Sequence, residues 1–319
     1  MDVFLLLAGA LSFFTGLWLI PWLAKEFKAH GVVGIDRHTG EKVAEMGGLG
    51  ILLAFLPGVM FMLFLHVYVN YPFPVMPVLT ALLVALILTI LGVVDDLIAL
   101  PKLPKAILPM FAAVPLIVLR QATPVMVLPF IGRINLGAFY LFAIVPVAIT
   151  VAANLANMVE GVNGLGSGLA IIYYSTLLIL SLMRGNHIIP IVFMPFLGAL
   201  LAFFLYNRPP ARIFPGDTGT YLMGGLFAAT AIAGNFETPA GLLFLPLVID
   251  FVIKALNGFP SKGWWAKRRG ELLYYDERPR HILQLVLKLF GPMSQTRLLV
   301  YLLVPEVLTA LMVFALYIL

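Results

Sequence analysis

The sequence predicts an all-α polytopic membrane protein, and three observations support this fold class. Of the 319 residues, 62% are hydrophobic and 11% are charged, whereas a soluble globular domain is about 45–50% apolar and about 25% charged. Apolar runs approaching the roughly 20 residues that a spanning helix needs recur along the chain. Lys and Arg gather in alternate loops between these runs. We therefore expect one integral-membrane domain over residues 1–319, which excludes a large soluble catalytic domain.

Ten apolar runs are predicted to span the membrane. The first has no basic segment before it, as a cleavable signal peptide would, so we expect it to be retained as a helix. The fourth is short and contains Pro109 and Pro115, but without it the flanking runs would have the wrong orientation. The runs fall at about 3–24, 46–69, 76–94, 106–119, 136–156, 165–183, 188–206, 219–234, 239–256 and 298–318.

The basic residues predict the orientation of these spans. With ten spans, 17 of the 20 Lys and Arg residues fall in one set of loops, and only Arg120, Arg133 and Arg184 fall in the other. The positive-inside rule places the richer set in the cytosol, so both termini are expected on the non-cytosolic side of the cell membrane. The net charge of +5 is therefore a topology signal and does not indicate a nucleic-acid partner.

Carboxylates gather in the same predicted cytosolic loops, which points to an active site at the cytosolic face. The chain has no cysteine, which excludes disulfides and a thiolate nucleophile or metal ligand. The acidic residues on this side are Asp36, Glu41, Glu45, Asp95, Asp96, Glu160, Asp217, Glu271, Asp276 and Glu277.

The first two polar segments flank the second and third spans. Glu45 precedes a Gly47-Gly48 pair, for which close helix packing is the expected role. Asp95 and Asp96 end the third span, where the negative end of the helix dipole disfavours carboxylates. A divalent cation or the following lysines, including Lys105, should compensate them; a plain loop at the membrane edge is the alternative.

The next two segments carry oxygen ligands. Asn154, Asn157, Glu160 and Asn163 recur every third residue, and amide and carboxylate oxygens suit Mg²⁺ or Mn²⁺. The alternative is that the asparagines hold helices together, but this role would not explain the carboxylate Glu160.

Asp217 follows Phe214-Pro-Gly before an apolar span. It could be a helix cap or a metal ligand at a helix N-terminus that also favours phosphate. Phe214 could stack on a base or simply pack.

The largest predicted cytosolic loop covers residues 257–296. Its Trp264-Trp265 pair beside basic residues fits an interfacial anchor that binds anionic headgroups. Arg278, Arg280 and His281 could instead clamp a phosphate. Asp250 and Glu306 lie inside predicted spans and are functional candidates by default; structural pairing, or a site near a helix end, is the favoured interpretation.

Together these loops resemble the polyprenyl-phosphate N-acetylhexosamine-1-phosphate transferase family, and most closely its archaeal and eukaryotic dolichyl-phosphate GlcNAc-1-phosphotransferase branch. Two features differ from the bacterial phospho-MurNAc-pentapeptide transferases: Glu160 replaces an Asp, and Arg278-Pro-Arg280-His281 replaces a His cluster. The second difference favours GlcNAc in the donor. The matching pieces are Glu45-Met-Gly-Gly, Asp95-Asp96 with eight residues before Lys105, Asn157 with Gly161 and Asn163-Gly-Leu, and Lys288-Leu-Phe-Gly-Pro292.

The resemblance implies transfer of GlcNAc-1-phosphate from UDP-GlcNAc to a polyprenyl (dolichyl) phosphate with release of UMP, the first step of lipid-linked glycan assembly in N-glycosylation. Within the family, the phospho-MurNAc-pentapeptide reaction is the alternative. A homodimer is left open. The implied roles are Mg²⁺ (or Mn²⁺) binding by Asn157 and Asp217, catalysis by Asp95, Asp96 and Lys105, and substrate binding by Glu45, Asn163, Phe214, Arg278, Arg280 and His281, with Asn163 and Phe214 holding the uracil. Asp95 or Asp96 could remove the last proton from the lipid phosphate, or could hold the lysine and the metal. A covalent aspartyl-phosphate is the minority alternative.

A ten-span transporter is the rival of a different class. Transporters place charges and broken helices near the middle of the membrane, whereas the carboxylates here gather at one edge. The enzyme is therefore the favoured hypothesis.

Overall fold

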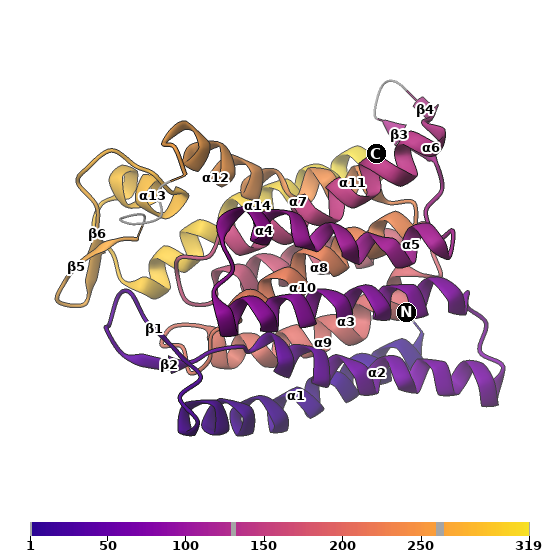
Figure 1. Ribbon diagram of the computed structural model, residues 1–319, viewed down its shortest axis with the longest axis horizontal. Helices are drawn as coiled ribbons and strands as arrows, with labels where there is room; N and C mark the ends of the chain where they lie inside the picture. Colours follow the sequence, from indigo (N-terminus) through magenta and orange to yellow (C-terminus); the bar gives the residue numbers. More distant parts are fainter. Residues whose placement is uncertain (1, 129–131, 260–264, 319) are drawn as a thin grey trace.

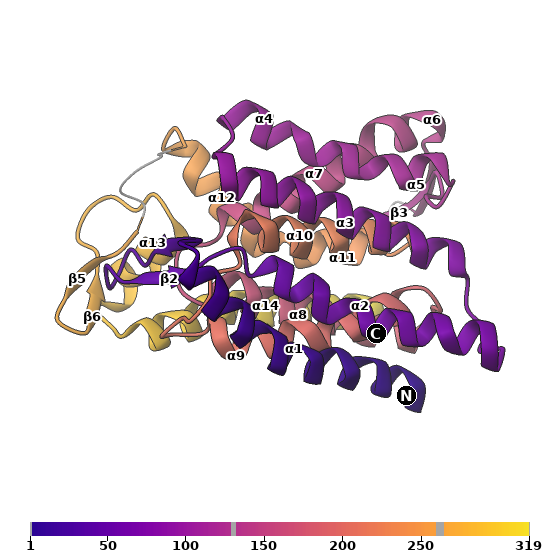
Figure 2. The same cartoon turned by 60° about the horizontal axis from the view of Figure 1, so that its bottom comes forward.

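The computed structural model describes residues 2–128, 132–259 and 265–318 and is predominantly helical. Its long helices lie side by side in a bundle (Figures 1 and 2). Each of its three sheets is a two-stranded antiparallel hairpin. The β1–β2 and β5–β6 hairpins lie with α13 at one end of the bundle, and the β3–β4 hairpin lies at the other end (Figure 1). The first loop and the largest loop, both predicted to be cytosolic, therefore meet at the same end.

The elements of the first half begin with helix α1 and end with helix α7. They are α1 (Val3–Ala29), β1 (Val33–Ile35), β2 (Lys42–Ala44), α2 (Gly48–Val69), α3 (Val75–Ile98), α4 (Lys102–Ile107), η1 (Leu108–Ala113), α5 (Val114–Val118), β3 (Val125–Leu128), β4 (Gly132–Asn135), α6 (Gly137–Phe139), η2 (Tyr140–Ile144) and α7 (Val145–Met158).

The second half is again mostly helical. Its elements are α8 (Leu165–Met183), α9 (Ile189–Asn207), α10 (Gly216–Ala233), α11 (Glu237–Leu243), α12 (Leu245–Leu256), β5 (Lys267–Arg269), β6 (Leu272–Tyr274), α13 (Ile282–Phe290) and α14 (Gln295–Ile318).

The prediction of several membrane-length helices is confirmed. Within the described ranges, seven helices are long and apolar enough to cross a membrane, or eight if α11 and α12, bent by 54°, form one span. The fourth predicted run is broken into α4, η1 and α5, and Pro109 and Pro115 each lie in the first turn of the piece that follows a break. Proline has no backbone N–H to continue a helix, so such breaks are expected there.

Helix α10 lies between α3 and α7. Its first turn is polar, because it contains Asp217 and Thr218. Its first turn is approached closely by two glycines of other helices. A Cβ on Gly92 would lie 2.3 Å from the Cα of Thr218, and a Cβ on Gly48 would lie 2.2 Å from the Gly219 nitrogen. The expected packing role of the Gly47-Gly48 pair is thus confirmed, and α2 and α3 hold the start of α10 in place.

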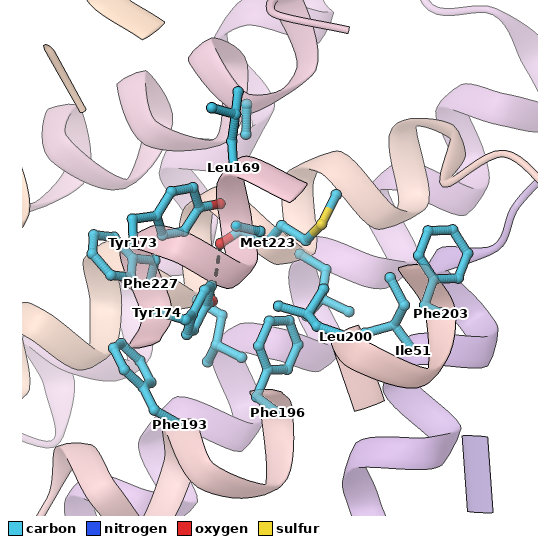
Figure 3. Packing of buried hydrophobic residues seen from close by; sticks show 14 of the residues in the cluster. Ile51, Leu169, Tyr173, Tyr174, Phe193, Phe196, Leu200, Phe203, Met223 and Phe227 are labelled. Atoms are coloured by element: carbon cyan, nitrogen blue, oxygen red, sulfur yellow. Dashed lines mark hydrogen bonds between the residues drawn. The ribbon is translucent and has the colours of Figure 1, made fainter. Parts of the chain in front are cut away.

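An aromatic cluster fills the centre of the bundle beside α10 (Figure 3). The rings of Phe193 and Phe227 stack with their centroids 5.5 Å apart. The buried hydroxyl of Tyr174 donates to the Met223 carbonyl at 2.9 Å, so this polar atom is satisfied inside the core. The cluster packs α8 and α9 against α10 and gives the polar end of α10 a rigid base.

Candidate active site

A cavity of about 300 Å³ opens at the end of the bundle that carries β1 and β2. Segments that are far apart in the sequence line it, and each of the four named next contains a motif that the sequence singled out. The lining includes Asp36, Arg37, His38 and Glu45 from the first loop, Asp96 from α3, Asn157, Glu160 and Asn163 from the α7–α8 segment, and Phe214, Asp217 and Thr220 around the start of α10.

Asp96 anchors the start of α10 from the neighbouring helix α3. Its Oδ1 accepts from the Asp217 N–H at 2.7 Å, and its Oδ2 accepts from the Thr218 N–H at 3.0 Å and the Thr218 hydroxyl at 2.6 Å. A carboxylate at this position satisfies free N–H groups of the first turn. Gly216 has φ +66°, and a Cβ there would lie 2.5 Å from Asp96 Oδ2, so glycine is required. Asp96 thereby fixes where Asp217 lies.

Lys105 lies between two of the carboxylates. Its Nζ is 2.5 Å from Asp217 Oδ2 and 3.0 Å from Asp95 Oδ2. Asp95 is 3% exposed, and it also accepts from the Tyr221 hydroxyl at 2.9 Å and from the Leu100 N–H. The expectation that a lysine compensates the Asp95-Asp96 pair thus holds for Asp95. Asp95 contributes by orienting Lys105, because its oxygens are fully engaged by the protein.

Asn157 and Asp217 lie in contact, as a shared metal site requires. The Asn157 amide donates to Asp217 Oδ1 and to the Thr220 hydroxyl at 2.9 Å. Both side chains line the cavity. Their oxygen donors are of the kind that Mg²⁺ uses.

Glu45 also faces this cavity from the end of the first loop. Burial raises the pKa of the Glu45 carboxyl, and the nearby negative charges of Asp96 and Asp217 raise it further. The positive charges of Arg37 and Lys105 act in the opposite direction and lower this pKa.

Asn163 and Phe214 both lie in the cavity wall, whereas the predicted phosphate clamp does not. Arg278 and Arg280 are exposed and are not part of the cavity lining. His281 is 0% exposed, and its Nδ1 accepts from the Leu283 N–H at 3.1 Å as the cap of α13. Burial lowers the pKa of the His281 ring to about 3, so it is neutral near pH 7. The three side chains are not brought together on the cavity as expected.

His281 instead belongs to a buried clamp that also contains Asp250 and Lys254. Asp250 is 0% exposed; its Oδ2 lies 2.9 Å from Lys254 Nζ, and its Oδ1 lies 3.5 Å from His281 Nδ1. Lys254 also donates to the carbonyl of Met158, which follows Asn157 directly. The structural pairing favoured for Asp250 is confirmed, and the clamp ties α12 and α13 to the end of α7.

Glu160 and Glu306 are the two other unusual carboxylates. Burial raises the pKa of Glu160 to about 8, and a Cβ on Gly166 would lie 1.9 Å from its Oε1, so glycine makes room for this carboxyl. Glu306 is 0% exposed, and among the described residues neither of its oxygens has a hydrogen-bond partner.

Several residues of the cavity wall were not predicted as site residues, among them Arg37, His38 and Trp265. Arg37 and His38 stand beside Asp36 in a loop that had been singled out for other residues. Trp265 had been interpreted as an interfacial anchor, but it lines the cavity, and the Arg37 guanidinium lies 5.1 Å from the centre of its ring. Trp264 lies outside the described residues. The sequence offered one signal for Arg37 and His38, which is that they directly follow the cytosolic carboxylate Asp36.

Comparisons with known proteins identify relatives of this chain. Residues 78–235 match the family described as glycosyl transferase family 4. The "Putative UDP-N-acetylglucosamine--dolichyl-phosphate N-acetylglucosaminephosphotransferase" of Saccharolobus solfataricus is 33% identical over 289 residues, which cover 89% of this chain and 88% of that protein. The protein of the same activity name from Dictyostelium discoideum is 28% identical over 350 residues, covering 93% of this chain and 85% of that protein.

A bacterial relative matches a smaller part. The phospho-N-acetylmuramoyl-pentapeptide-transferase of Leuconostoc mesenteroides is 36% identical over 139 residues, which cover 44% of this chain and 42% of that protein. The archaeal and eukaryotic relatives above match along most of both chains. With these relatives and a cavity built from the predicted carboxylates, lysine and amides, the chain belongs to glycosyl transferase family 4.

Proposed function

We propose that this protein transfers GlcNAc-1-phosphate from UDP-GlcNAc to a polyprenyl (dolichyl) phosphate, releasing UMP. The observation that carries the proposal is the meeting of Asp96, Asn157, Asp217 and Lys105 at one cavity, in a chain similar over most of its length to a relative named for this reaction. The phosphomonoester of the lipid has a second pKa of about 6. Near pH 7 it therefore needs little activation, and the protein's main task is to hold two anions together.

The proposed topology has ten spans, both termini on the non-cytosolic side and the cavity at the cytosolic face. It is supported by the distribution of basic residues, since Arg37 and Lys105 lie beside the cavity and the loop around Arg268 meets the first loop at the carbonyl of His38. A cytosolic cavity also gives access to a nucleotide sugar.

Mg²⁺ fits the oxygen donors of the cavity. Asp217 and Asn157 would hold it, with the Asn157 amide turned so that its oxygen faces the ion. Within the described ranges no group of three or more His, Cys, Asp or Glu side chains forms a metal site, so phosphate oxygens of the donor would complete the ligand set, as is usual for Mg²⁺. The bound ion would supply positive charge to the donor pyrophosphate. The carboxylates of Glu45, Asp96 and Asp217, which all line the cavity, support this assignment.

The protein's own residues then divide the work. The lipid phosphate oxygen attacks the phosphorus that carries GlcNAc, and the bond to the UMP oxygen breaks, so that UMP leaves. Lys105 neutralises phosphate oxygens in this transfer, and Asp95 and Asp96 keep Lys105 and Asp217 in place. The ionised lipid phosphate needs no base for direct attack, and the oxygens of Asp95 are occupied by Lys105, Tyr221 and Leu100.

An apolar cavity of about 270 Å³ along α7 is proposed to take the prenyl chain. It is lined by Ile144 at the end of η2 and by Ala148, Val151 and Leu155 of α7. The three α7 residues lie three or four positions apart and so share one face of the helix. This face leads from η2 toward Asn157 at the end of α7. A chain lying along it would present its phosphate to the polar cavity.

The decisive test is UMP release by the purified protein. We expect release from UDP-GlcNAc to require both dolichyl phosphate and Mg²⁺, and UDP-MurNAc-pentapeptide to release none. If UMP were released only from UDP-MurNAc-pentapeptide, the protein would catalyse the bacterial reaction instead. If neither donor released UMP, the proposed activity would be refuted.

A further inference from the structure

Asn163 is held in the cavity wall by a carboxylate of a different loop. Its Nδ2 donates to Asp36 Oδ2 at 2.8 Å, and both residues are buried, with exposed fractions of 8% and 4%. The first loop is joined to the α7–α8 segment a second time, where the His38 ring lies 2.8 Å from the Gly161 carbonyl. These two contacts hold the first loop against the α7–α8 segment and so fix the position of the Asn163 amide.

The chemistry of Asp36 determines which end of this amide faces the cavity. An ionised carboxylate only accepts hydrogen bonds, so the NH₂ group of Asn163 must point to Asp36. Asp36 cannot turn to change this, because its Oδ1 accepts from the His38 N–H at 2.7 Å and the Thr39 N–H at 3.1 Å. Among the residues that the structure describes, no donor is bonded to Asn163 Oδ1, and Asn163 lines the cavity. The cavity thus presents a fixed acceptor at this position.

We propose that Asp36 makes the cavity select uracil over cytosine by fixing Asn163 as a hydrogen-bond acceptor. The inference rests on the proposed function and on the role that the family resemblance implies for Asn163, which is to hold the uracil of the donor. Uracil carries an N–H at ring position 3 and can donate to Asn163 Oδ1, whereas neutral cytosine has a lone pair there and meets an acceptor with an acceptor. Asp36 does not touch the nucleotide in this proposal and acts as a positioning residue.

The substitution Asp36→Asn tests the proposal because it reverses one contact and keeps the others. The new Oδ1 can still accept from the N–H groups of His38 and Thr39, while an NH₂ group replaces Oδ2. Asn163 must then turn its oxygen to residue 36 and its NH₂ to the cavity, where it can donate to cytosine. We would measure binding of UMP, CMP and N3-methyl-UMP to the detergent-solubilised full-length protein by calorimetry.

The wild type should bind UMP about tenfold more tightly than CMP or N3-methyl-UMP, the scale of one mismatched buried hydrogen bond. The D36N protein should lose this preference, with the ratio of UMP to CMP affinity falling about tenfold or more. If Asp36 had a purely structural role, the substitution would weaken the binding of UMP and CMP by the same factor. A D36N protein that binds nucleotide with the wild-type ratio overturns the inference.

Asp2→Asn is the matched control. Asp2 also accepts from a backbone N–H, that of Phe4 at 3.0 Å, and from a side-chain donor, the Tyr71 hydroxyl at 2.6 Å. It lies at the start of α1, away from the cavity lining, so the ratio of UMP to CMP affinity should not change in D2N.

If D36N is unstable, the wild type and the variant Asn163→Ala still test the inference. Equal wild-type affinity for UMP and N3-methyl-UMP would refute it, and so would an unchanged ratio of UMP to CMP affinity in N163A. If the wild type binds no UMP at all, the proposed function itself fails.

Discussion

Breaking the buried clamp at Lys254 should destabilise the protein and slow the reaction together. The substitution Lys254→Met keeps the length of the side chain and removes its charge. Lys254 is 8% exposed and Asp250 is 0% exposed, so the variant leaves a buried carboxylate without its 2.9 Å ion-pair partner. Removing one partner of a buried pair costs about 3–5 kcal/mol, and we expect a loss in this range in the free energy of unfolding.

The double variant Asp250→Asn with Lys254→Met separates the charge effect from packing. The amide introduced at position 250 is neutral, and its oxygen can still accept from the Ile282 N–H, which lies 2.9 Å from Asp250 Oδ1 in the protein. We therefore expect the double variant to recover about 2 kcal/mol or more relative to K254M alone, a coupling within the range for residues in one network. Denaturant unfolding in detergent micelles measures both values.

Lys267→Met is the exposed control. Lys267 pairs with Asp276 and Glu277 at 2.7 Å, but solvent screens exposed pairs, so its loss should hardly move the unfolding midpoint. Because Lys254 also holds the carbonyl of Met158 next to Asn157, kcat for UMP release should fall in K254M even where the protein is fully folded. A K254M protein as stable as K267M, or a double variant no more stable than K254M, would refute the reasoning.

Three further predictions concern the cavity. Asp217→Ala should abolish Mg²⁺-dependent UMP release in a protein that still folds, and activity above about a tenth of wild type would contradict the metal assignment. Lys105→Ala should chiefly weaken binding of UDP-GlcNAc, because its Nζ lies 2.5 Å from Asp217 at the cavity; an unchanged affinity by calorimetry would exclude this role. Glu160 has its pKa raised by burial to about 8 from an ordinary value of 4.5, so the folded state keeps a proton that the unfolded state releases. Its contribution to stability is full below about pH 4.5 and is lost as the pH rises through about 8, and Glu160→Gln should flatten the fall of the metal-free unfolding midpoint over this interval; equal slopes would contradict it.

Much of the fold could be read from composition and local pattern. All ten predicted apolar runs contain helix, because a chain in lipid must satisfy its backbone polar groups within each segment. The fourth run differs from the prediction for a local reason, since prolines break it into short pieces. The residues of the proposed metal and phosphate site, Asn157, Asp217 and Lys105, were also visible, because charged and amide side chains are rare in so apolar a chain.

The pairings within the site were not visible. Sequence placed Asp96 among the catalytic candidates, but only the folded chain showed that it caps α10 from a neighbouring helix. Sequence grouped His281 with Arg278 and Arg280 by proximity along the chain. The structure buries His281 against Asp250 and leaves both arginines exposed. Neighbours in sequence share a loop, but the direction of each side chain depends on what packs against that loop.

The sequence by itself therefore determined the class of protein, the helical segments and the short list of residues able to bind a metal or a phosphate. These properties follow from composition and from the spacing of side chains along one segment. The tertiary structure alone decided that Asp36 holds Asn163, that Asp95 holds Lys105 and that Lys254 holds the end of α7. Asp36 and Asn163 lie 127 residues apart, and no local pattern encodes such a contact, because it depends on how the helices and loops between them pack.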